Sequence, residues 1–120
     1  MKSPISNRVN TIFIPVSDLK QSVRWYSDLI GQPFDLENVT PPVYNMPIGH
    51  STGVALDAGM EEVAPSPHPL FNFHTDDIDA AYLFVQKLGY EISQDVIRFP
   101  DIAFFQIKDP DGNVIMICNG

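Results

Sequence analysis

The sequence is poor in cysteine and contains no long hydrophobic run. Its one cysteine, Cys118, excludes an intrachain disulfide. Because it lies in an apolar segment, we expect a small buried hydrophobic side chain rather than a nucleophile. No apolar stretch approaches the roughly 20 residues that a membrane helix needs. Residues 1–10 lack the hydrophobic core of a signal peptide, so we expect a cytoplasmic protein.

Basic residues are also scarce. The chain has 7 Lys and Arg against 15 Asp and Glu, which gives a formal net charge of -8. Nucleic acids and anionic membrane surfaces are bound by clustered basic side chains, and here these side chains are scattered. We therefore expect neither kind of partner. A length of 120 residues and a hydrophobic content of 44% are typical of one globular domain.

A repeated pattern is the most informative feature that is present. A short apolar strand ends in an Asp–hydrophobic pair at Asp18 and again at Asp77. After each Asp, apolar residues recur at helical spacing until a glycine, Gly31 or Gly89. The aspartates suit the N-cap of a helix, and the glycines suit the left-handed position that follows a helix. The sequence thus predicts two similar modules.

Further strands are expected after each helix, so that the predicted order is β-α-β-β-β twice. The turn Asp109–Asn113 joins the last two strands as a hairpin. Proline-rich Pro65–Pro69 indicates a stiff linker between the modules. We place module 1 at about 8–60, the linker at about 61–69 and module 2 at about 70–119 of a single domain, 1–120. The additional predicted strands are 34–37, 43–46, 52–57, 91–95, 102–107 and 114–118.

Three groups of motifs follow one another along the chain: Pro15–Leu19 with Trp25-Tyr26 and Leu29–Gly31, then Asp77–Ala81 with Leu88–Tyr90, then Lys108–Asn113. In these motifs, and over nearly its whole length, the chain resembles the vicinal oxygen chelate superfamily, the glyoxalase/bleomycin resistance/dioxygenase proteins. The resemblance implies an α+β fold in which two βαβββ modules form a curved mixed sheet around a cavity. It says less about activity, because one fold serves many chemistries.

The same resemblance implies where metalloenzyme members hold their metal, and the corresponding residues here are Thr11, Leu70 and Met116. Leu70 has no donor atom, a Thr11 hydroxyl is a poor ligand, and the Met116 thioether suits only soft metals. We therefore expect no metal and no cofactor. Glyoxalase and dioxygenase activities are put in doubt, because the metal polarises the substrate oxygens in such enzymes.

Strand alternation and the resemblance together predict the residues that face the cavity. Their mixture of apolar and polar groups suits a small aromatic or amphipathic ligand, although the same side chains would also serve simply to fill a core. We expect a metal-free binding protein similar to bleomycin-resistance-type members. Family members commonly pair, so we expect a homodimer. The predicted ligand-binding set is Thr11, Phe13, Tyr44, Met46, Leu70, Asn72, His74 and Met116.

Two other hypotheses stay open. The chain would be a lyase, isomerase or dioxygenase if His74, His50 or Asp57 formed a relocated metal site or an acid–base pair. It would be a structural or regulatory module if it acted only through its dimer. The sequence identifies neither the ligand nor a catalytic residue.

Overall fold

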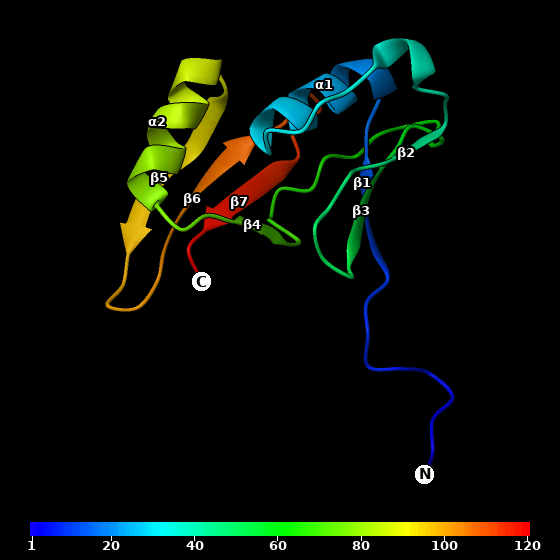
Figure 1. Ribbon diagram of the computed structural model, residues 1–120, viewed down its shortest axis with the longest axis horizontal. Helices are drawn as coiled ribbons and strands as arrows, with labels where there is room; N and C mark the ends of the chain where they lie inside the picture. Colours follow the sequence, from blue (N-terminus) through cyan, green and yellow to red (C-terminus); the bar gives the residue numbers. More distant parts are fainter. The chain divides into compact units, whose positions relative to one another are not determined.

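Each half of the chain forms one mixed β-sheet with one α-helix (Figure 1). The structure is a computed structural model that describes residues 1–120. It divides into two units, Met1–Glu61 and Glu62–Gly120, which we describe separately. The fold is α+β, as the sequence predicts. Neither helix has both the length and the apolar character needed to span a membrane.

The first unit contains, in chain order, β1 (Thr11–Pro15), α1 (Leu19–Leu29), the 3-10 turn η1 (Leu36–Asn38), β2 (Val43–Asn45) and β3 (Gly53–Asp57). Its three strands form a sheet in the order β1-β3-β2. Strand β3 lies between a parallel neighbour, β1, and an antiparallel one, β2.

Helix α1 begins where the capping pattern predicts. The Asp18 carboxylate accepts a hydrogen bond from the backbone N–H of Gln21 at 3.1 Å. The buried stripe of the helix includes Val23 and Tyr26, and α1 contacts β2 and β3. Gly31 follows the helix with φ +66°, a conformation that favours glycine.

The predicted strand at 34–37 is wrong. The Asp35 side chain accepts from the backbone N–H of Glu37 at 3.1 Å and from the Asn38 amide at 2.6 Å. A side chain that bonds to nearby backbone in this way stabilises a tight turn in competition with extended structure. The segment therefore forms η1, and the first unit has one strand fewer than predicted.

The second unit has the predicted order β-α-β-β-β. Its elements are β4 (Asn72–His74), α2 (Ile78–Leu88), β5 (Glu91–Arg98), β6 (Ala103–Lys108) and β7 (Val114–Cys118). The four strands form a sheet in the order β4-β7-β6-β5, with β4 and β7 parallel and the other pairs antiparallel. The pairing of β5 with β6 is irregular on both sides of Gln94.

The predicted turn between β6 and β7 is held by a buried carboxylate. Asp109, which is 5% exposed, accepts from the backbone N–H groups of Asp111 at 2.9 Å and Asn113 at 2.8 Å. The Asn113 side chain in turn accepts from the backbone N–H of Ser66 at 3.1 Å. The turn therefore holds part of the proline-rich segment against the start of β7.

Candidate functional site

The two faces of the second sheet differ in their partners. Phe105 on β6 is fully buried and stacks on Tyr82 of α2 with a ring separation of 5.3 Å. The Tyr82 hydroxyl also donates to Asp95 of β5 at 2.6 Å. Phe105 and Asp95 therefore lie on the face that α2 covers. Since side chains alternate along a strand, Phe104 and Gln106 point to the opposite face.

We call this opposite surface the distal face of the second sheet. The strand register places Gln94, Gln106, Met116 and Asn72 in one row that crosses all four strands. The next row contains Phe104 and His74, on either side of Cys118. The distal face is defined by Asn72, His74, Gln94, Phe104, Gln106 and Met116.

Three of the predicted ligand-binding residues meet on this face. Asn72 Nδ2 lies 3.9 Å from Met116 Sδ, a weak hydrogen bond to a thioether. His74 belongs to the same strand as Asn72, and its Nε2 lies 2.8 Å from Asp76 Oδ1. Leu70 precedes β4 and is 74% exposed.

One polar atom of this row is left without a partner. Oε1 of Gln94 is buried and accepts no hydrogen bond. Such an atom is costly, because it loses water without gaining another donor. In the neighbouring row the Phe104 ring stacks on Phe99 with a ring separation of 6.2 Å. The distal face thus combines amide groups with an aromatic surface.

In the first unit the predicted residues divide between two sheet faces. Tyr44 pairs with Leu56, which pairs with Ile14, so these three side chains lie on the face that packs toward α1. Met46 continues this alternation and is buried. Phe13, with Thr11 on the same face, points the other way and is 58% exposed. Tyr44 and Met46 therefore lie on the opposite face of the first sheet from Thr11 and Phe13. This differs from the prediction that all four side chains line the same cavity.

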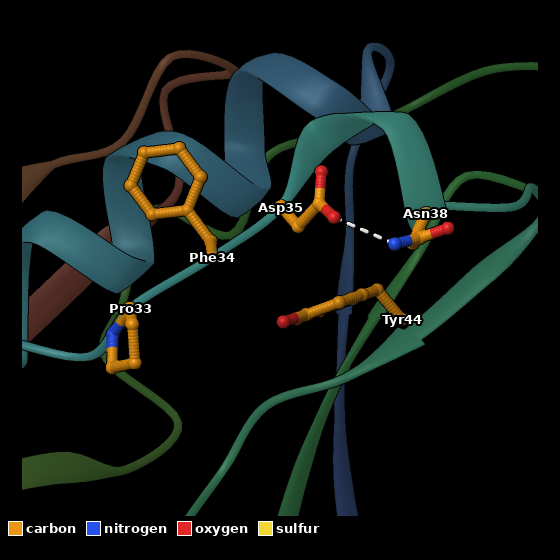
Figure 2. A pocket seen from close by; sticks show the side chains of 5 residues that line it. All are labelled: Pro33, Phe34, Asp35, Asn38 and Tyr44. Atoms are coloured by element: carbon orange, nitrogen blue, oxygen red, sulfur yellow. Dashed lines mark hydrogen bonds between the residues drawn. The ribbon is translucent and has the colours of Figure 1, made fainter.

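Tyr44 instead lines a pocket of about 380 Å³ beside η1 (Figure 2). Its side chain points from β2 into this pocket, below the hydrogen-bonded Asp35 and Asn38. Pro33 and Phe34 complete the lining. The Asp35 carboxylate already accepts hydrogen bonds from Glu37 and Asn38, and these bonds stabilise η1. We therefore assign the hydrogen-bonding groups of Asp35 to the local fold rather than to ligand binding.

The comparisons with known proteins agree with this architecture. Residues 8–117 match the family model of the Glyoxalase/Bleomycin resistance protein/Dioxygenase superfamily. The chain belongs to this superfamily. A glyoxylase-like domain-containing protein from Didymella fabae is 30% identical over 122 residues, which cover 95% of this chain and 94% of that protein. The fold is the one shared by solved structures of the superfamily.

Among similar solved structures, TnmS3, an antibiotic binding protein from Streptomyces sp. CB03234, is 26% identical with a TM-score of 0.74. The match covers 97% of each chain. Oxidase ChaP-H2 is 16% identical with a TM-score of 0.73, over 97% of this chain and 95% of its own, which shows a common fold alone. The superfamily fold therefore occurs in both a binding protein and an enzyme.

The residues at the superfamily's metal positions do not fit a metal. By the resemblance these positions are Thr11, Leu70 and Met116, which offer one hydroxyl, no donor and one thioether. No group of three or more His, Cys, Asp and Glu side chains is placed to hold a metal ion. Asp57 and His50 are the residues of the first unit that the sequence suggests for a relocated metal site. The Asp57 carboxylate accepts from the backbone N–H of Gly59 at 2.8 Å, and His50 is exposed in the connection that precedes β3.

Three residues of the distal face, Gln94, Phe104 and Gln106, are missing from the predicted ligand-binding set. Gln106 could be predicted from the sequence, because a hairpin closed by the turn at Asp109–Asn113 places Gln106 opposite Met116. The position of Gln94 could not be predicted in this way, because the bulge in β5 reverses the side-chain alternation.

Proposed function

We propose that this protein is a metal-free member of the superfamily that binds a small aromatic or amphipathic molecule. The observation that carries the proposal is the distal face of the second sheet. Amide and thioether groups meet there beside the stacked Phe104 and Phe99 rings. Small-molecule sites combine aromatic and other apolar side chains with oriented polar groups, and the distal face offers both kinds.

The likeness to TnmS3 supports binding rather than chemistry, because TnmS3 is an antibiotic binding protein and shares 26% of its residues with this chain. Of the predicted ligand-binding residues, we propose that Asn72, His74 and Met116 contact the ligand, with Asn72 and Met116 central. For Thr11, Phe13, Tyr44, Met46 and Leu70 the role in binding stays a prediction from the sequence. We also propose a cytoplasmic homodimer with a single domain, and light scattering at micromolar concentration tests the dimer.

A thermal-shift screen tests the proposed binding. The probes are a library of amphipathic aromatic compounds, and a compound present at 100 times its Kd stabilises the folded state by about 2.7 kcal/mol. We expect at least one compound to raise Tm by several degrees. The Met116→Lys variant removes this shift, because it places a charge in the centre of the distal face.

The matched control is Leu83→Lys, at a 60% exposed position on α2. We expect it to leave the shift unchanged. The proposal is wrong if no compound stabilises the protein, or if every stabilising compound acts equally on the wild type and on Met116→Lys.

A further inference from the structure

We infer that the pocket beside η1 binds a quaternary ammonium group, in a second site that differs from the distal face. This site belongs to the first unit, and its lining residues are Pro33, Phe34, Asp35, Asn38 and Tyr44. The inference goes beyond the proposed function and does not depend on it. It also gives Tyr44 a role other than the cavity wall that the sequence predicts.

The first observation is the lining of the pocket. Its volume of about 380 Å³ is at the lower end of the roughly 300–1,000 Å³ that is typical of small-ligand sites. Pro33 and the rings of Phe34 and Tyr44 are apolar, and none of the lining residues is basic. Phe34 and Tyr44 are half-buried, so the protein holds one part of each side chain and leaves another part open to a ligand. The pocket therefore suits a small group with an apolar surface.

The second observation is the orientation of the Tyr44 ring. Tyr44 extends from β2 into the pocket, and Figure 2 shows its ring edge-on, with Asp35 on the side of one ring face. The face of an aromatic ring carries partial negative charge and attracts a cation that lies within about 6 Å of the ring centre. A cation between the Tyr44 ring and the Asp35 carboxylate meets negative potential on both sides.

The third observation is that η1 holds the Asp35 carboxylate in place. The carboxylate accepts from the backbone N–H of Glu37 at 3.1 Å and from the side-chain amide of Asn38 at 2.6 Å. These bonds occupy its hydrogen-bonding groups, but its negative charge still acts on a nearby cation. A quaternary ammonium group has no N–H to donate and needs the charge alone. A primary ammonium group is strongly hydrated and would exchange its water for acceptors that are already in use.

The charge of the whole chain acts in the same direction. A formal net charge of -8 attracts cations from solution, and this attraction weakens as salt is added. One cation–π contact at an exposed site contributes little. We therefore expect a small cation to bind with modest affinity and to exchange rapidly, which makes nuclear magnetic resonance titration the suitable measurement.

Three related alcohols test the inference. Choline carries a trimethylammonium group, 3,3-dimethylbutan-1-ol replaces that nitrogen by carbon and is neutral, and ethanolamine carries a primary ammonium group. The signals to follow at constant ionic strength are the backbone N–H of Glu37 and the side-chain amide of Asn38, since both donate to Asp35. We expect choline to shift both signals saturably, with a Kd roughly fivefold or more below that of either other probe.

Substitutions then locate the site. Asp35→Asn removes the charge and keeps an oxygen that accepts from Glu37, and we expect it to raise the Kd for choline about threefold or more. Tyr44→Leu removes the aromatic face, and we expect a similar increase, whereas Tyr44→Phe keeps that face and binds choline within about twofold of the wild type. The control is Phe84→Leu, which removes a 42% exposed ring from α2 and leaves the titration unchanged.

The inference is overturned if 3,3-dimethylbutan-1-ol or ethanolamine binds as tightly as choline, or if choline shifts neither of the two signals. It is also overturned if folded Asp35→Asn and Tyr44→Leu proteins bind choline as the wild type does. Should Tyr44→Leu fail to fold, Asp35→Asn decides the same question, because Asp35 is exposed. The library screen with Met116→Lys concerns the distal face, so its result and this one are independent.

Discussion

At the scale of single residues, Tyr82 links α2 to β5. Its hydroxyl donates to Asp95 at 2.6 Å, and its ring stacks on Phe105. The hydrogen bond to Asp95, partial desolvation and the negative charge of Asp95 all favour the neutral phenol. They raise the pKa of Tyr82 above its ordinary value of 10.0.

We expect Asp95→Asn to lower the pKa of Tyr82 toward 10.0, because the substitution removes the negative charge and the charged acceptor. The measurement is an ultraviolet absorbance titration of the tyrosines in the wild type and the variant, with Tyr82→Phe in each background to identify the signal. An unchanged Tyr82 titration would contradict this assignment.

The same shift has a consequence for stability. The pKa of Tyr82 is higher in the folded than in the unfolded state, so the hydrogen bond stabilises the fold fully below about pH 10. This stabilisation is lost as the pH rises through the folded-state pKa. We expect the difference in unfolding free energy between the wild type and Tyr82→Phe to decrease over that range in urea titrations.

The residues of the distal face show how much of the candidate site can be predicted from the sequence. The family resemblance predicted Met116, strand parity with Leu70 predicted Asn72, and the two side chains lie in contact. Gln106 follows from the hairpin register but needs the turn at Asp109–Asn113 to be taken as fixed. Gln94 depends on a bulge, which strand periodicity does not reveal.

At the scale of elements, capping decides where the helices begin. Asp77 accepts from the backbone N–H of Ala80 at 3.0 Å and caps α2. We expect Asp77→Ala to lower the free energy of unfolding by about 1 kcal/mol, because one donor of the first turn loses its partner. Asp77→Asn is the matched control, and we expect it to retain most of the stability, since Asn is an equally good N-cap.

Urea unfolding followed by circular dichroism measures both variants. Equal losses for Ala and Asn would mean that the negative charge near the start of the helix, rather than the cap, is responsible. No loss in either would mean that the capping bond does not contribute to stability.

Elements with strong local signals were predictable and those with competing signals were not. The last strand was predicted at 114–118 and is Val114–Cys118. Both helices begin after the predicted aspartates. The segment at 34–37 has apolar residues that suit a strand, but Asp35 bonds to the backbone of Glu37 and turns the chain. Strand patterns do not include such a local side-chain bond.

At the scale of the whole molecule, one pattern used twice supplies the fold of the superfamily. The resemblance puts the metal of its metal-dependent members at positions that are Thr11, Leu70 and Met116 here, and for this reason we propose binding rather than metal-dependent catalysis. The net charge of -8 accompanies scattered basic residues, and this disfavours polyanionic partners. Both features agree with the small-molecule ligand that we propose.

The metal content of the purified protein tests this conclusion at the level of the whole molecule. We expect protein that is purified without chelator to carry far less than one equivalent of Zn, Ni, Fe or Mn, and EDTA to leave its Tm unchanged, because Leu70 and Met116 offer no hard or nitrogen donor. A stoichiometric transition metal in the wild type, with a Tm that falls when the metal is removed, would show that other side chains have taken over the site and would favour an enzyme.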